Sequence, residues 1–169
     1  LLEGEPGVGK SRLLYEFLRR LDGTGFLELE STCASYGRAM AYRPILELLR
    51  GYLSLLEGMT EEDVRGRVDE RLQSLGLEGE ERAVLLAHFL GVSAPPELVN
   101  RLSADQLKER TLNLVREVFL RASESAPIVL TVENAHWIDP SSAAFLGHLA
   151  AGLRNRYADA PTITSIDTR

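Results

Sequence analysis

A short glycine-rich run near the start of the chain has the composition of a phosphate-binding loop. Gly4–Ser11 fits the pattern G-x-x-x-x-G-K-[ST]. Glycines let successive backbone N–H groups converge on phosphate oxygens, and the following helix adds its positive N-terminal end. In such loops the lysine, here Lys10, reaches the β and γ phosphates, and the next hydroxyl, here Ser11, ligates Mg²⁺. The residues predicted to bind a nucleotide are Gly4, Glu5, Pro6, Gly7, Val8, Gly9, Lys10, Ser11 and Arg12.

The surroundings of this loop favour the phosphate site over a plain glycine turn. A strand stub, Leu1–Leu2, precedes the loop, and an amphipathic helix with apolar residues at helical spacing follows it. No Asn-Lys-x-Asp sequence, the signature of guanine specificity in GTPases, occurs in the chain. The expected ligands are therefore ATP and Mg²⁺.

A second polar site follows a short apolar run. Nucleotidases with such a loop need a carboxylate at the end of a neighbouring strand to hold Mg²⁺, and usually an acid that activates water. Glu133 ends the apolar run and is the predicted metal-side carboxylate. Asn134 stands where the general base is expected, but an amide cannot accept a proton at neutral pH. The sequence thus predicts slow or absent hydrolysis. The alternative to a metal site at Glu133 and Asn134 is a solvated pair of residues at the end of a strand.

Other residues near these sites have simpler interpretations. His136 is interpreted as a structural histidine, with a catalytic or sensor role as the alternative, and Trp137 as a packing residue rather than a base-stacking one. Asp139 is the expected N-cap of a helix that begins with proline. A loop role is preferred for Ser35–Arg38. Cys33, the only cysteine, is expected to be a small buried apolar residue.

The composition limits the possible partners. The chain has 169 residues, room for one domain, and 25 acidic against 19 basic residues give a net charge of −6. This balance argues against a broad surface for nucleic acid or anionic lipid. No apolar run approaches the ~18 residues of a membrane span, and there is no signal-peptide pattern. A cytoplasmic protein with no direct nucleic-acid or membrane partner is expected.

The periodicity of apolar residues predicts strands that alternate with helices. Expected strands are 26–30, 128–132 and 162–166, and expected helices are 13–21, 45–56, 60–75, 80–90, 103–122 and 139–153. This order indicates an α/β fold with a parallel sheet and right-handed crossovers. The expected fold class is that of a P-loop nucleoside triphosphatase, with a helical insertion at about 44–124 between the second strand and the strand that ends at Glu133.

The ends of the sequence suggest a fragment of a longer protein. The chain begins with Leu1 instead of methionine, immediately before the phosphate loop, and stops at Arg169 directly after an expected strand. The whole range 1–169 is therefore expected to be the core of one P-loop ATPase domain that lacks most of its first strand, its C-terminal strand and its lid.

Three stretches together resemble the ATPase modules called signal-transduction ATPases with numerous domains, which are related to AAA proteins. They are Gly4–Phe17, then Ser35–Ala39 together with Tyr42–Ile45, and finally Val132–Pro140. The similarity is closest to modules beside bacterial class III adenylate or guanylate cyclases and in large transcriptional regulators. In that family the pair at 133–134 is usually two acids, so Asn134 departs from the pattern, whereas Arg169 matches a phosphate sensor.

The resemblance implies a regulatory role. The expected function is an ATP-binding module of a multidomain signalling protein, in which MgATP binding acts as a conformational switch and hydrolysis is slow. The alternative is a non-hydrolysing or degenerate module that serves as an interaction platform; a small-molecule kinase fits less well because no arginine-rich lid is found. The expected partners are ATP, ADP and other domains of the same polypeptide, and the candidate catalytic residues are Asn134 and Arg169.

Overall fold

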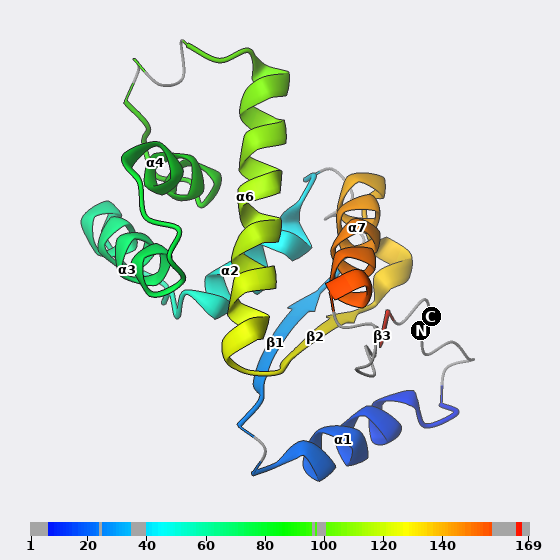
Figure 1. The fold of residues 1–169 in the computed structure, drawn as a ribbon. Coiled ribbons are helices and arrows are strands. Elements are labelled where there is room, and N and C mark those ends of the chain that lie inside the picture. The colour runs from blue at the N-terminus through cyan, green and yellow to red at the C-terminus, as the bar shows by residue number, and fades with distance from the viewer. Residues whose placement is uncertain are drawn as a thin grey trace. The chain divides into compact units, whose positions relative to one another are not determined.

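The computed structural model describes residues 7–23, 25–34, 40–95, 97, 101–156 and 165–166 (Figure 1). The chain divides into two compact units. The first joins Leu1–Leu48 to Ser123–Arg169, and the second is Leu49–Ala122. Each unit is described by itself below.

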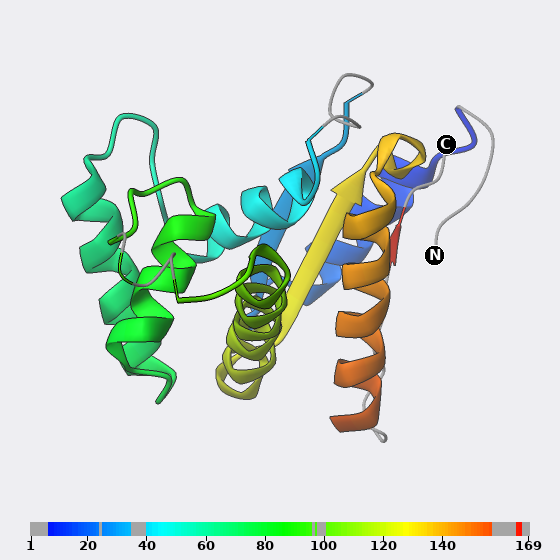
Figure 2. The ribbon, with the colours of Figure 1, turned by 90° about the horizontal axis from the view of Figure 1, so that it is seen from above.

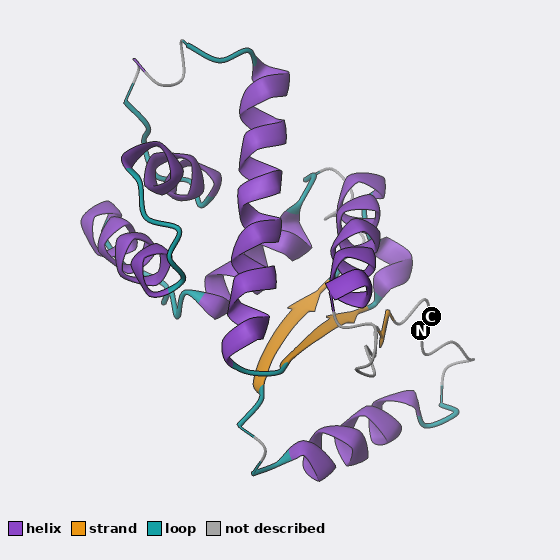
Figure 3. Cartoon of the chain, viewed as in Figure 1, coloured by secondary structure: helices purple, strands orange, loops and turns teal. Residues whose placement is uncertain are grey.

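A parallel sheet forms the centre of the first unit. Its strands are β1 (Leu27–Thr32), β2 (Ile128–Glu133) and β3 (Ser165–Ile166), in the order β1-β2-β3. Leu27 pairs with Ile128 and Thr32 pairs with Glu133, so β1 and β2 end together at one edge. All described strands belong to this unit (Figure 3). The α/β class and the parallel sheet are therefore confirmed.

Two long helices and a short one accompany the sheet. These are α1 (Lys10–Leu21), the 3-10 helix η2 (Ala135–Trp137) and α7 (Pro140–Arg156). Figure 2 shows α7 running beside β2, as it also does in Figure 1. Apolar side chains of the strands and of α7 are buried, among them Leu29, Val132, Phe145, Leu146 and Leu149. No residue of α1 is buried, although its apolar residues recur at helical spacing.

The second unit is helical. Helices α3 (Glu61–Ser74) and α4 (Glu80–Phe89) lie wholly within it. Helix α2 (Arg43–Tyr52) ends in this unit, and α6 (Ala104–Ser125) begins in it. In the sequence all four helices follow β1 and precede β2. Helix α3 begins with a complete capping box, in which the Thr60 side chain accepts from the backbone N–H of Asp63 and the Asp63 side chain accepts from that of Thr60.

Aromatic and aliphatic side chains fill the core of the second unit. The rings of Tyr52 and Phe119 lie 6.2 Å apart at 55°, and the Arg71 guanidinium sits 5.0 Å from the centre of the Tyr52 ring. Residues four apart on α3, Val64 and Val68, are buried on one face. The buried face of α6 consists of Thr111, Leu114, Val115, Val118, Phe119 and Ala122.

Several element boundaries differ from the predicted ones, and α1, α6 and α7 are each a few residues longer than expected. Helix α2 ends at Tyr52, four residues before the expected end, because Ser54 adopts a left-handed backbone with a φ of 53°. Strand β1 begins and ends slightly later than expected, at Leu27 and Thr32. Of the expected last strand only Ser165–Ile166 is described, and Leu1–Leu2 lies outside the described residues. Among the described helices, none has the length and apolar character needed to cross a bilayer.

Candidate functional site

The described part of the phosphate loop is a turn that leads into α1. Gly7 and Gly9 have φ angles of 86° and 97°, in the left-handed region. A residue with a Cβ pays about 1–2 kcal/mol for that conformation. A Cβ built on either glycine would meet no atom within 4 Å. The backbone conformation, and not crowding by the protein, is therefore what requires glycine at these two positions.

The N-terminus of α1 is suited to an anion. Gly9 is the N-cap residue and has no side chain with which to cap the helix. The first turn contains no acidic residue, and Lys10, Ser11 and Arg12 begin the helix. The N–H groups of a first helical turn and the helix dipole favour a negatively charged ligand there. The residues present thus fit the phosphates of a nucleotide.

Arg12 is held along the helix by an ion pair. Its Nη2 lies 2.9 Å from Oε1 of Glu16, one turn further on, and its Nε donates to the same oxygen at 3.0 Å. Arg19 also lies 3.5 Å from Glu16 Oε2. Glu16 therefore draws the guanidinium of Arg12 toward the body of α1.

Glu133 stands at the carboxyl edge of the sheet. It is the last residue of β2 and is exposed. It pairs with Thr32, and the backbone N–H of Cys33 donates to the Glu133 carbonyl at 2.9 Å. In open α/β sheets ligands bind outside the carboxyl ends of the strands. The carboxylate of Glu133 thus lies at the edge where such a site is expected.

Asn134 makes the turn that leaves β2. Its φ of 53° and ψ of 39° are left-handed, and it is the N-cap residue of η2. The Trp137 N–H donates to the Asn134 carbonyl at 2.9 Å and closes the turn. Asparagine and aspartate tolerate this conformation better than other residues with a side chain. The left-handed backbone is therefore a reason for asparagine at position 134 that does not involve catalysis.

A polar network that the sequence did not reveal ties α2 to the end of β1. Glu47 Oε2 accepts hydrogen bonds from the Ser31 hydroxyl at 2.8 Å and from the Thr32 N–H at 3.3 Å. The other oxygen, Glu47 Oε1, accepts from Arg43 Nε at 2.9 Å. The spacing of Arg43 and Glu47, four apart on a helix, was the only available signal. This network fixes the backbone beside the Thr32–Glu133 pair.

Cys33 is buried, with 5% of its surface exposed, as predicted. Burial raises the pKa of its thiol, and the charges of Glu47 and Asp139 raise it further, against an opposing contribution from Arg43. The thiol therefore stays protonated at neutral pH and is a poor nucleophile.

The segment after Asn134 ends in a helix cap. Asp139 Oδ1 accepts from the Ser142 N–H at 2.9 Å, and Pro140 is the first residue of α7, which confirms the predicted N-cap. Asp139 is 4% exposed, and its Oδ2 has no partner among the described residues. The rings of His136 and Trp137 lie 5.0 Å apart at 49°, and Trp137 is 36% exposed.

Of the predicted site residues, Glu133 and Asn134, which are neighbours in the sequence, lie at one edge of the sheet. Thr32, which was not among the predicted site residues, lies beside them. Helix α1, which begins with Lys10 and Ser11, buries no residue. Within the described ranges, no group of three or more His, Cys, Asp or Glu side chains forms a metal site. The predicted residues outside the described part of the chain are Gly4, Glu5, Pro6, Ser35–Arg38 and Arg169.

Comparison with known proteins identifies the family. The model of the AAA ATPase domain matches residues 1–158. The uncharacterized protein R02095 of Rhizobium meliloti (strain 1021) is 28% identical over 154 residues, which cover 89% of this chain and 14% of that protein. The chain therefore spans about a seventh of the length of this relative. No solved structure gives a significant match. Residues 1–158 cover nearly all of the chain, and the chain belongs to the family of AAA ATPase domains.

Proposed function

We propose that this chain is the ATP-binding module of a multidomain signalling protein, in which MgATP binding acts as a conformational switch and hydrolysis is slow. One observation carries the proposal. The left-handed glycines Gly7 and Gly9 lead directly into the N-terminus of a helix that begins with Lys10 and Ser11 and has no acidic residue in its first turn. Backbone donors, helix dipole and a lysine together are the chemistry that binds the phosphates of a nucleotide.

Each residue has a distinct part in this proposal. Lys10 supplies positive charge to the β and γ phosphates. The Ser11 hydroxyl and the Glu133 carboxylate would bind Mg²⁺. Bound Mg²⁺ would neutralise charge on the phosphates. Magnesium is commonly held by one or two protein oxygens together with phosphates and water, so oxygens from Ser11 and Glu133 would suffice. Arg169 is proposed as the phosphate sensor.

Asn134 supports a second candidate, a module that binds ATP without hydrolysing it. Its amide occupies the position after the metal-side carboxylate, where a general base would be expected, and it also makes the left-handed turn out of β2. A protein that binds ATP and does not turn it over would act as an interaction platform whose state depends on nucleotide exchange.

The proposed partners are other domains of the same polypeptide. The relative from Rhizobium meliloti is about seven times as long as the matched segment, which supports a module within a larger protein. We further propose membership of the signal-transduction ATPases with numerous domains, beside a cyclase or in a transcriptional regulator. The nucleotide state would then be transmitted to an output domain.

The direct test is to compare two lysine variants. Lys10→Ala should abolish MgATP binding, because it removes the point charge that reaches the β and γ phosphates. Lys108→Ala provides a matched control, since Lys108 is the only other lysine and is exposed on α6. Isothermal titration with MgATP measures both affinities. Unchanged affinity in Lys10→Ala would contradict the proposal, and an equal loss in Lys108→Ala would show that the effect is not local.

A further inference from the structure

We propose that the pocket between α3 and α4 binds a small organic cation, an ammonium group on an apolar body, at a site separate from the nucleotide. The pocket has a volume of about 320 Å³ and lies wholly within the second unit. Volumes of roughly 300–1,000 Å³ are typical of small-molecule sites.

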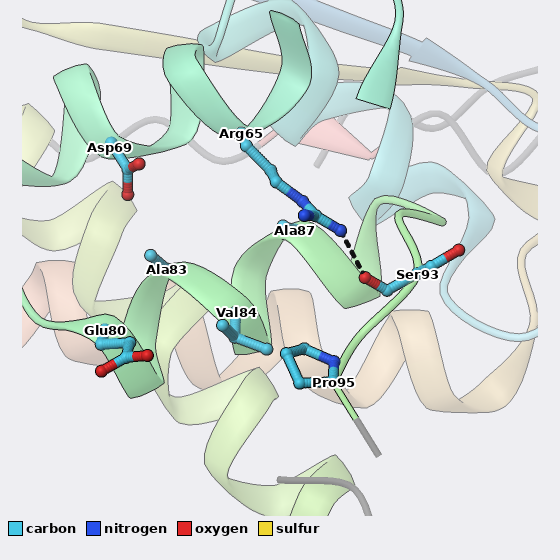
Figure 4. A pocket seen from close by; sticks show the side chains of 8 residues that line it. All are labelled: Arg65, Asp69, Glu80, Ala83, Val84, Ala87, Ser93 and Pro95. Atoms are coloured by element: carbon cyan, nitrogen blue, oxygen red, sulfur yellow. Dashed lines mark hydrogen bonds between the residues drawn. The ribbon is translucent and has the colours of Figure 1, made fainter. Parts of the chain in front are cut away.

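Small and apolar side chains make the middle of this pocket. Ala83, Val84 and Ala87 lie on α4, and Pro95 lies in the segment after it. Figure 4 shows these four side chains between the polar residues at the two ends of the pocket. Because alanines four apart leave space between the helices, an apolar body can take the place of the missing side chains. Covering such a surface releases water and favours binding.

The two ends of the pocket differ in charge balance. At one end Arg65 Nη2 donates to the Ser93 carbonyl at 2.6 Å (Figure 4). The same nitrogen lies 3.5 Å from Glu61 Oε2. The Ser93 hydroxyl donates to the other oxygen of Glu61 at 3.0 Å. The positive charge of Arg65 is thus compensated within the protein.

The acidic end has no such side-chain partner, although the dipole of α4 favours a carboxylate at Glu80. Asp69 and Glu80 line the pocket from α3 and α4, and Figure 4 places both on the side away from Ser93. Neither carboxylate has a hydrogen bond or ion pair with any described residue. Two unpaired negative charges beside an apolar surface attract a cation and disfavour an anion. A ligand with its ammonium group between these carboxylates and its apolar part over Ala83 satisfies both features.

Hexylammonium is the probe that tests this inference, with hexanol and hexanoate as matched neutral and anionic probes. Amide chemical shifts of the whole chain, followed by NMR, should give a Kd of about 1–10 mM for hexylammonium, with shifts at Ala83, Val84 and Ala87. Hexanol should bind several-fold more weakly, and hexanoate should cause no shifts there.

Variants separate the pocket from general attraction of cations to an acidic protein. Asp69→Asn and Glu80→Gln should each weaken hexylammonium binding about two- to fivefold. Ala83→Leu should remove binding by filling the cavity, and the circular dichroism spectrum reports whether the helices persist. Glu62→Gln, an exposed acid of α3 outside the pocket, should leave binding unchanged.

Three results would overturn the inference. They are an absence of shifts in the pocket with hexylammonium, equal binding of hexanol, and an equal loss of affinity in Glu62→Gln. Nucleotide binding takes no part in these measurements, so their outcome is independent of the proposed function.

Discussion

Asn134 makes a backbone turn at a position where a nucleotide hydrolase would be expected to have a carboxylate as general base. Its left-handed φ of 53° is one that aspartate also tolerates, whereas glutamate has no such preference. Asn134→Asp therefore introduces a carboxylate while keeping the turn between β2 and η2. This makes the aspartate variant a cleaner test of hydrolysis than the glutamate variant.

We expect Asn134→Asp to raise ATP turnover, by about 10²- to 10⁴-fold when the rest of the site is intact, because a general base acts in the transition state. ATP affinity should stay within a few fold. Phosphate release under single-turnover conditions measures the rate. Asn113→Asp, on the exposed surface of α6, is the control for the added charge. An unchanged rate in Asn134→Asp, with wild type already hydrolysing ATP, would place the base elsewhere.

Among the elements, α3 has a helix start that can be tested directly. The Thr60 hydroxyl and the Asp63 carboxylate form the capping box, and a hydrogen bond from the Thr60 side chain lowers the pKa of Asp63, with a further contribution from the Thr60 backbone. Thr60→Ala should cost about 0.5–2 kcal/mol of unfolding free energy, measured by urea denaturation. Thr60→Ser keeps the hydroxyl and should leave the stability nearly unchanged.

The same cap gives α3 a dependence on pH. Because the folded-state pKa of Asp63 is below its ordinary value of 3.8, the carboxylate stabilises the helix at neutral pH. That contribution is lost as the pH falls through the lowered folded-state pKa. Thr60→Ala should therefore lose less stability on acidification than wild type does. Parallel acid dependence in the two proteins would show that the cap does not control the titration.

Elements with local signals were predictable, and elements that depend on tertiary contacts were not. The start of α3 follows from Thr60 and the acids after it, and the cap of α7 follows from Asp139 before Pro140. The early end of α2 depends on a left-handed Ser54, a conformation that serine does not signal. In the same way, the bond from Ser31 to Glu47 joins a strand to a helix and leaves no pattern in the sequence.

The candidate site shows the same division. The left-handed turn at Gly7 and Gly9 could be predicted, because its backbone geometry dictates glycine at both positions. The binding of phosphate there stays a prediction. The position of Glu133 followed from the apolar run before it, and the register with Thr32 agrees with a place at the sheet edge. The unpaired carboxylates of Asp69 and Glu80 could not be found in this way, because they lie on different helices and line one pocket only after α3 and α4 pack.

At the scale of the whole molecule, the two units should respond separately to mutation. Leu86 is fully buried in the second unit, so Leu86→Ala should cost about 2–5 kcal/mol of unfolding free energy in that unit. ATP affinity, measured where the variant remains folded, should change less than twofold. Leu56→Ala is the control, because Leu56 is 68% exposed. A large fall in ATP affinity in Leu86→Ala would show that the units are energetically coupled.

The pairing of β1 with β2 also sets an order of events during synthesis. Leu27 and Ile128 are about a hundred residues apart in the chain, and contacts at such separation form slowly. The helices between them make shorter-range contacts and are complete on the nascent chain before β2 leaves the ribosome. The edge that carries Glu133 should therefore assemble after these helices, and β3 can pair with β2 only later still. We expect a newly made chain to pass through a stage in which its helical unit is folded and the sheet beside Glu133 is not yet formed.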